Sequence, residues 1–378
     1  MIDAPGIPLT VIAFFLVIGP LIFIHEMGHY LVGRWFGVKA EAFSIGFGKE
    51  VAGWTDSRGT RWKVGWMPLG GYVKFAGDMN PASQPSEEWL ALPPEERAQT
   101  FQAKPVWQRF LIVLAGPLVN FLFAILVFMA VFAAFGQART PSLVGAVEPG
   151  SAAAAAGIRA GDRLTMVANR SVDHFEDIGR IVVIRAGETV PVDVYRDGRQ
   201  LHLTARIGTE LQRDRFGNEF KVGLLGIRGT GRQVREPVAL LDLPFVAVER
   251  TVQVVRMIID TSWQIISGRR SVKELGGPLK IAQFSGQMAT LGWFDLLMFM
   301  TMISINLGFI NLLPIPLLDG GHLLFYGVEA VRRRPVNPQV TEWAFRSGLA
   351  VLLAFMMFVT VNDLSSFGLW TRLAGLIG

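Results

Sequence analysis

Long apolar runs are the dominant pattern along this chain. Four of them occupy about residues 7–33, 108–135, 295–327 and 343–363. A transmembrane helix needs about 20 predominantly apolar residues, and each run is long enough to form one. Residues 7–24 carry no charge at all, which gives an uncharged helix of about 27 Å. The pattern therefore predicts a polytopic α-helical membrane protein with about four transmembrane helices.

An alternating pattern follows the first apolar run. Apolar residues alternate with other residues at 43–47 and again at 62–66, with a polar turn between them at 55–59. Period-2 alternation is typical of strands, so we expect a membrane-associated β element over residues 37–80. The next strand in this element would lie beside the first run and offer an edge to an extended peptide, whereas a hairpin that only packs against the protein is the alternative. This expected edge consists of Gly70, Gly71, Tyr72, Val73, Lys74 and Phe75.

The segment between the second and third runs has the pattern of a small α+β domain. A strand is expected at 144–147, Ser151 is a helix N-cap, and Gly161 with Asp162 forms a turn into another strand. This part resembles a bacterial PDZ domain, whose groove binds an extended peptide or a C-terminus by strand addition. An α+β domain of another kind is the alternative.

A second amphipathic segment lies between this domain and the third run. Over residues 245–267 the apolar side chains fall on one helical stripe, and charged side chains lie opposite. Such a helix either lies on the outer membrane surface or packs on the PDZ-like domain, and the pattern leaves both interpretations open.

Composition agrees with a membrane protein. The 378 residues are 51% hydrophobic and 18% charged, and the formal net charge is +5. No basic stripe with interleaved aromatic residues is present, so we expect contact with the lipid bilayer and no nucleic-acid partner. There are no cysteines, which excludes disulfides, thiolate metal sites and a cysteine nucleophile.

Loop charge predicts the orientation in the membrane. Arg332, Arg333 and Arg334 lie in the short loop between the third and fourth runs. Positive residues in short loops favour the cytoplasmic side. Alternation of four spans then puts residues 34–107 inside, and both termini and residues 136–292 outside. The C-terminal end of the first span is therefore expected near the cytoplasmic side, and the PDZ-like domain is expected to be extracytoplasmic.

Three titratable residues interrupt the first apolar run. His25 and His29 lie at i and i+4 on one helical face, so both imidazoles can reach a single zinc ion, while Glu26 can act on a water at that ion. Ionisable residues inside a membrane span are functional-site candidates. A pair of core-facing histidines without a metal is the alternative.

A third metal ligand is expected in the third run. Two prolines and two glycines interrupt that run over residues 311–322 and break the helix. Irregular backbone at membrane depth lines a protein cavity or a water-filled cavity, so Asp319 is a carboxylate free to bind metal there. His322 is the rival ligand, and an Asp319 that only caps the Gly-Gly turn is a further alternative.

Together these motifs resemble the site-2 protease family, in its regulator of sigma-E protease branch. The resemblance rests on residues 25–29, on 104–107 with 115–120, and on 311–320, and it extends over nearly the whole chain. It implies that His25, His29 and Asp319 bind Zn²⁺ and that Glu26 is the general acid/base. It further implies that Asn311 helps to hold the substrate backbone and that the strand at 70–75 lies beside the active site. Some members carry tandem PDZ domains, whereas the Gly-Asp turn occurs once here.

The resemblance implies an intramembrane zinc endopeptidase of the bacterial inner membrane, active in regulated intramembrane proteolysis. Its substrates would be single-pass membrane proteins already trimmed by another protease, such as anti-sigma factors, and signal-peptide remnants are a further class. The alternative is a membrane-tethered PDZ scaffold whose metal site is catalytically silent. A metal or ion transporter is a weaker alternative, because no inverted repeat is visible in the sequence.

These inferences divide the chain into nine expected regions. They are the first transmembrane helix with the paired histidines (1–36), the β element (37–80), a polar linker (81–106), the second transmembrane helix (107–136), the PDZ-like domain (137–209), an extracytoplasmic linker with amphipathic helices (210–292), the broken third helix (293–330), a cytoplasmic loop (331–342), and the fourth helix with the tail (343–378).

Overall fold

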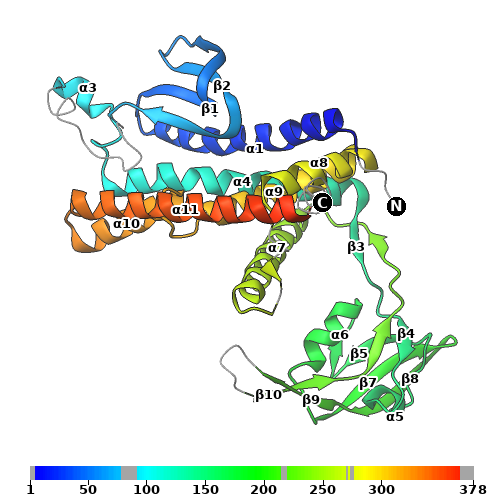
Figure 1. The fold of residues 1–378 in the computed structure, drawn as a ribbon. Coiled ribbons are helices and arrows are strands. Elements are labelled where there is room, and N and C mark those ends of the chain that lie inside the picture. The colour runs from blue at the N-terminus through cyan, green and yellow to red at the C-terminus, as the bar shows by residue number, and fades with distance from the viewer. Residues whose placement is uncertain (1–4, 78–91, 214–218, 270, 273–275, 367–378) are drawn as a thin grey trace, which may run out of the picture. The chain divides into compact units, whose positions relative to one another are not determined.

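The computed structural model describes residues 5–77, 92–213, 219–269, 271–272 and 276–366 (Figure 1). The chain forms two compact units. The membrane unit comprises Met1–Met129 and Pro244–Gly378, and the PDZ-like unit comprises Ala130–Leu243.

Within the described residues, four helices have the length and the hydropathy to cross a bilayer, as the apolar runs predict. They are α1 (Ile7–Trp35), α4 (Val106–Phe135), α9 (Trp293–Asn311) and α11 (Pro338–Ser366). Each is predominantly apolar on the surface that it presents outward, which is expected of helices surrounded by lipid. The chain is therefore a polytopic helical membrane protein, and its expected tail beyond residue 366 lies outside the described residues.

The third apolar run is broken, as its prolines and glycines predict. Helix α9 ends at Asn311, and α10 (Asp319–Arg332) begins after a non-helical segment. Pro314 and Pro316 cannot donate backbone hydrogen bonds within this segment, so it does not continue the helix. Leu317 adopts a positive φ of 80°, which sets the sharp entry into α10.

Two further helices belong to the membrane unit. Helix α7 (Leu243–Ile266) matches the amphipathic segment expected over 245–267. Helix α8 (Pro278–Leu291) packs on α1, where a Cβ at Gly286 would lie 2.7 Å from the Thr10 Oγ1. Its N-terminus is capped from α11, because the Asp363 carboxylate accepts a hydrogen bond of 3.1 Å from the Gly277 backbone.

The segment between the β element and the second membrane helix is only partly described. Of the polar linker expected over 81–106, residues 81–91 lie outside the described residues. The described part includes the short helix α3 (Pro94–Ala98), whose first turn contains Glu95 and Glu96.

The predicted β element is a sheet made by two long strands, β1 (Ala40–Thr55) and β2 (Arg61–Phe75). The start of β1 lies between the two ends of β2, because Ser44 pairs with both Lys63 and Tyr72. The expectation of a separate strand at 70–75 is corrected: those residues are the end of β2, which bends back along β1. On its other side this end pairs with no strand in the described parts of the chain, so it is an edge of the sheet.

The PDZ-like unit contains a four-stranded sheet in the order β6-β5-β7-β8. Its core is made of apolar side chains such as Leu164, Val192 and Val194, which are fully buried between the sheet and two helices. Period-2 burial along β7 explains the alternating sequence there. The elements are β4 (Val144–Val147), α5 (Ala152–Ala155), β5 (Arg163–Val167), β6 (Arg170–Ser171), α6 (Phe175–Val182), β7 (Thr189–Arg196) and β8 (Arg199–Arg206).

The PDZ-like unit is longer than expected. The prediction ended the domain at residue 209 and placed a linker after it, but four more strands lie before residue 237. Two of them return to the beginning of the unit, since β11 pairs with β4 and β12 pairs with β3. Such long-range pairing leaves no local signal in the sequence, which is why the boundary was wrong. The four strands are β9 (Gly208–Arg213), β10 (Glu219–Leu224), β11 (Ile227–Gly229) and β12 (Val234–Glu236), and β3 (Gln137–Arg139) lies at the start of the unit.

Candidate metal centre

Helix α1 carries three polar residues on a face that is otherwise packed against protein. His25, Glu26 and His29 are 7%, 8% and 9% exposed. Helix α4 approaches this face closely, because a Cβ at Gly28 would lie 2.5 Å from the Ala115 carbonyl oxygen. The glycine therefore permits the close helix contact that buries both imidazoles.

The start of α10 brings a carboxylate to the same place. Asp319 is the first residue of α10, and two glycines follow it. A Cβ at Gly320 would lie 2.2 Å from the Leu313 carbonyl oxygen, and one at Gly321 would lie 2.5 Å from the Ile315 carbonyl oxygen. Only glycine fits at these positions, so the Gly-Gly pair lets the broken segment fold tightly and directs Asp319 toward α1.

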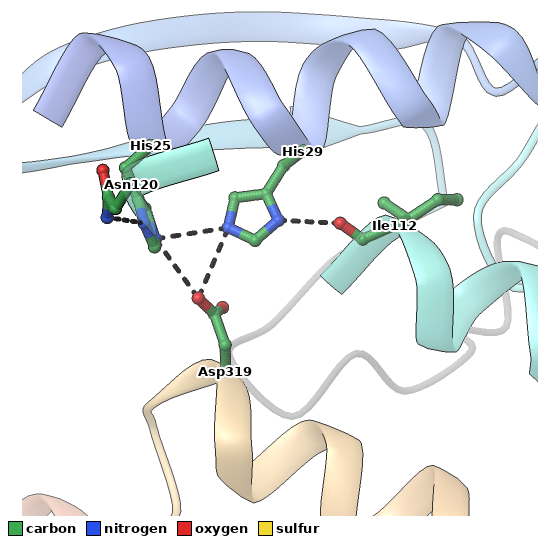
Figure 2. Close-up of polar contacts among 5 residues, drawn as sticks. All are labelled: His25, His29, Ile112, Asn120 and Asp319. Carbon is green, nitrogen blue, oxygen red and sulfur yellow. Dashed lines mark hydrogen bonds and ion pairs between the residues drawn. The ribbon is translucent and has the colours of Figure 1, made fainter. Parts of the chain in front are cut away.

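Figure 2 shows that the three predicted ligands converge. The Nε2 atoms of His25 and His29 lie 3.3 Å apart. The Asp319 Oδ2 atom lies 3.2 Å from the His25 Nε2 and 3.5 Å from the His29 Nε2. In the described parts of the chain, these three residues form the group of side chains that can hold a metal ion.

The donor set fits zinc. Tetrahedral zinc with bonds of about 2.05 Å places its ligand atoms about 3.3 Å apart, which agrees with all three separations. The Asp319 Oδ2 atom is buried and makes no well-formed hydrogen bond with the described residues. A buried carboxylate oxygen without such a bond is costly, and coordination of a cation would satisfy it. Two imidazoles and one carboxylate leave the fourth position open, as catalytic zinc sites require.

The second membrane helix supplies the partners of both imidazoles. The His29 Nδ1 donates a hydrogen bond of 2.9 Å to the Ile112 carbonyl, and the His25 Nδ1 lies 3.0 Å from the Asn120 side-chain amide (Figure 2). The sequence interpretation used Asn120 only as part of a family motif and gave it no role. The available signal was the spacing of Ile112, Gly116 and Asn120, which places them on one face of a helix.

The remaining predicted site residues lie around one cavity in the membrane unit. Its volume is about 750 Å³, and its lining includes Asn311 and all six residues of the edge at 70–75, together with Glu26 and the three candidate ligands. The structure thus brings together every residue that the sequence suggested for this site. Their chemical roles remain proposals.

The β2 edge passes directly beside Glu26. A Cβ at Gly71 would lie 3.0 Å from the Glu26 Cγ and 2.7 Å from the Ile22 side chain. Val73 and Glu26 line the same cavity. A peptide that paired with this edge would therefore run past Glu26 and the candidate metal ligands.

His322, the alternative third ligand, lies outside the group of candidate ligands. It lines the cavity one turn after Asp319, and its ring packs against the Phe345 ring with centroids 4.8 Å apart. The compact ligand group contains Asp319 and not His322. The geometry favours the aspartate as the third ligand.

Similarity to known proteins extends over nearly the whole chain. Residues 13–355 match peptidase family M50. A proposed zinc metalloprotease of Mesorhizobium japonicum is 45% identical over 361 residues, which cover 94% of this chain and 98% of the relative. Metalloprotease MmpA of Caulobacter vibrioides is 36% identical over 395 residues, which cover 98% of this chain and 99% of the relative.

Solved structures are also similar to a part of the chain. One of them is the crystal structure of a PDZ domain from an SdrC-like protein of Listeria monocytogenes. The match is 17% identical and covers 23% of this chain and 84% of that chain, with a TM-score of 0.19.

Proposed function

The chain belongs to peptidase family M50 and is a zinc-dependent metalloprotease, and from this premise we propose that it cleaves peptide bonds within transmembrane segments. The observation that carries the proposal is the position of the candidate ligands. His25 and His29 lie in a helix able to span a membrane, and Asp319 begins the helix that follows the break in the third apolar run. The cavity beside them includes an open strand edge.

The proposed mechanism assigns the proton transfers to Glu26. His25, His29 and Asp319 would hold zinc, which when bound supplies Lewis-acid polarisation of the scissile carbonyl and promotes ionisation of water. Glu26 takes a proton from the attacking water while the water oxygen forms a bond to the carbonyl carbon. It then gives that proton to the leaving amine as the carbon–nitrogen bond breaks. The buried position of Glu26 keeps bulk water away from these steps.

Substrate binding requires local unwinding. The amides of a transmembrane helix are hydrogen-bonded within that helix, so the scissile bond is accessible only after a few residues become extended. An extended segment can pair with the β2 edge at residues 71–75 by strand addition. The Asn311 side chain, which lines the same cavity, would satisfy backbone groups that the unwinding frees.

The proposed substrates are single-pass membrane proteins that another protease has already trimmed. Proteins of the anti-sigma-factor type and signal-peptide remnants fit this description, and their cleavage would constitute regulated intramembrane proteolysis. The family resemblance and the loop charges support a location in the bacterial inner membrane, with the active site near the cytoplasmic side and the PDZ-like unit extracytoplasmic. The groove of the PDZ-like unit would bind an extended peptide or a C-terminus.

A reconstituted cleavage assay tests this function. The purified chain in liposomes should cut a designed single-pass substrate within its apolar segment, and mass spectrometry of the products locates the cut. Glu26→Gln should lower the cleavage rate by about 100-fold or more, because general acid–base catalysis is lost. It should leave the zinc content unchanged, because Glu26 is not a ligand.

Two results would contradict the proposal. Zinc-loaded wild-type protein that cuts none of the transmembrane substrates would favour the alternative, a membrane-tethered PDZ scaffold. Loss of zinc from Glu26→Gln would instead place Glu26 among the ligands and remove it from the role of general base.

A further inference from the structure

Helix α4 contacts both candidate histidine ligands through one face. Ile112, Gly116 and Asn120 are spaced four residues apart, which is the spacing of His25 and His29 on α1. Ile112 accepts the His29 hydrogen bond, and Gly116 leaves room for that ring, since a Cβ there would lie 2.2 Å from the His29 Nε2. Asn120 occupies the corresponding place beside His25.

Asn120 is an unusual residue for its surroundings. It lies in the middle of a membrane-spanning helix and is 0% exposed. Its side chain makes one hydrogen-bonding contact with the described residues, in which the amide is placed with its Nδ2 3.0 Å from the His25 Nδ1, and its Oδ1 is buried without a partner in those parts of the chain. A buried amide with an unsatisfied atom is costly, whereas a leucine, which has the same branched shape, carries no polar atom that needs a partner. The contact with His25 is the interaction that explains an amide at this position.

The backbone of Asn120 is held from another membrane helix. The Ser304 hydroxyl of α9 donates a hydrogen bond of 3.0 Å to the Asn120 carbonyl. Gly308, one turn further along α9, is close enough that a Cβ there would lie 3.3 Å from the Asn120 Cβ. These contacts fix the position of the Asn120 backbone against α9.

The chemistry of a neutral imidazole specifies what His25 needs from this partner. If the Nε2 atom offers its lone pair to a metal, the proton is on Nδ1, and Nδ1 must donate. The amide oxygen and nitrogen of asparagine have nearly the same shape, so the hydrogen-bond network decides which of them faces His25. Metal ligation through Nε2 requires that the Asn120 Oδ1 faces the His25 Nδ1.

We propose that Asn120 is a positioning residue of the metal centre, which accepts a hydrogen bond from the His25 Nδ1 and directs the His25 Nε2 toward Asp319 and His29. The inference rests on the proposed ligand set of His25, His29 and Asp319. Asn120 touches neither the metal nor the substrate, and it acts through the orientation and the tautomer of the His25 ring.

Metal affinity is the direct test. In the purified full-length protein, Asn120→Leu should weaken zinc binding by about 10–100-fold in competition with a chromophoric chelator, the usual effect of removing such a partner. Asn120→Asp keeps an acceptor oxygen and should restore an affinity within a few-fold of wild type. The visible absorption of the Co²⁺-substituted protein should shift in Asn120→Leu and return in Asn120→Asp, since the ligand field reports ring orientation.

A matched control separates metal positioning from general packing. Thr301 is also 0% exposed in the membrane unit, and its hydroxyl bonds to the Leu297 carbonyl within α9. Thr301→Val should leave zinc affinity and the Co²⁺ spectrum unchanged. The thermal unfolding of the metal-free proteins, measured in parallel, should show Asn120→Leu no less stable than Asn120→Asp, because a buried carboxylate costs more than an apolar side chain and the proposed contact acts on the metal site.

Three results would overturn the inference. They are wild-type zinc affinity in Asn120→Leu, an Asn120→Asp affinity no better than that of Asn120→Leu, and an equal loss of affinity in Thr301→Val. His25→Ala distinguishes a failure of the proposed ligand set from a failure of the proposed role of Asn120. If it keeps full zinc affinity, the proposed ligand set fails. If it loses zinc while Asn120→Leu does not, only the role of Asn120 fails.

Discussion

At the scale of single residues, the candidate metal centre consists of polar groups placed where apolar side chains would make the helix more stable. His25, Glu26 and His29 are all less than 10% exposed on a helix able to span a membrane. Ionisable residues in such a position are costly, so they are candidates for a functional site. The geometry allows each of them a separate task, since the two imidazoles converge on Asp319 while Glu26 faces the β2 edge.

The assignment of the third ligand is tested by two substitutions one turn apart. Asp319→Asn should reduce zinc affinity by more than the roughly 10–100-fold that is usual for outer-shell changes, because it removes a ligand. His322→Ala should keep zinc, since the His322 ring packs on Phe345 outside the ligand group. The zinc content of each purified variant after dialysis against a weak chelator measures the effect of each substitution. The reverse pattern would make His322 the ligand.

At the scale of elements, the β2 edge links the sheet to the chemistry. Residues 71–75 pair with β1 on one side, and on the other side they line the cavity. On that side they pair with no other strand in the described parts of the chain. The edge is therefore able to receive a strand without any change in its pairing with β1.

Removal of one backbone donor tests strand addition. Val73→Pro should lower cleavage of a transmembrane substrate by about tenfold or more, because a misplaced substrate backbone reacts slowly. Zinc should remain bound, since no ligand changes. Val73→Ala is the control, because it shortens the side chain but keeps the N–H. Equal cleavage rates for Val73→Pro and Val73→Ala would rule out pairing at this amide.

Within the PDZ-like unit, an ion pair joins the turn before β5 to the end of β7. Asp162 is 0% exposed and accepts hydrogen bonds of 2.6 and 2.7 Å from the Arg196 guanidinium. Burial alone would raise the pKa of the Asp162 carboxyl, but the bonds from Arg196 and from the Arg159 backbone hold that pKa below its ordinary value. A lowered pKa in the folded state stabilises the unit at neutral pH, and this stabilisation is lost as the pH falls through the lowered pKa.

Breaking this pair should destabilise the unit. Arg196→Met leaves a buried carboxylate without its cation and should cost about 3 kcal/mol of unfolding free energy at pH 7. The difference from wild type should shrink as the pH falls below about 4, where Asp162 becomes neutral in the unfolded chain. The change in unfolding free energy is measured by hydrogen exchange of β5 and β7 peptides in the full chain, corrected for intrinsic exchange rates. Arg199→Met, at an exposed position on β8, is the control. A pH-independent loss would mean that packing, not charge, is responsible.

At the scale of the whole molecule, the candidate metal centre lies within one of the two units. The candidate ligands, Glu26 and the β2 edge all belong to the membrane unit. The PDZ-like unit is inserted into the chain between α4 and α7, and its two ends meet in the β3–β12 pair. The pairing of Arg139 with Val234 brings the start and the end of the insertion together.

This arrangement allows a precise deletion. Replacement of residues 140–233 by a short Gly-Ser bridge keeps β3 and β12 and should preserve both zinc binding and cleavage of a trimmed substrate. The preference for trimmed over full-length substrate should fall by about fivefold or more, because the unit can act only by differential affinity or steric exclusion. Rates for both forms of one substrate are compared in the two proteins. An unchanged ratio would contradict a gating role, and loss of all cleavage would show that the unit supports the membrane core.

Local pattern was sufficient for much of this protein. Apolar runs locate the four membrane helices, since hydrocarbon leaves a backbone few alternatives to a helix of the right length. The i, i+4 spacing of His25 and His29 and the prolines before Asp319 identify the candidate ligands, because charge and helix breakers are rare in such runs. Alternation likewise identifies the β element, although it divides the end of β2 into a separate strand.

Contacts between distant segments could be decided only by the folded chain. The pairing of β11 and β12 with the beginning of the PDZ-like unit, and the packing of α4 against α1, join residues about a hundred positions apart. Such contacts depend on the fit between two folded surfaces, and they produce no periodic pattern of apolar residues in either segment. For the same reason Asn120 is only one polar residue in an apolar run until the tertiary structure places its amide beside His25.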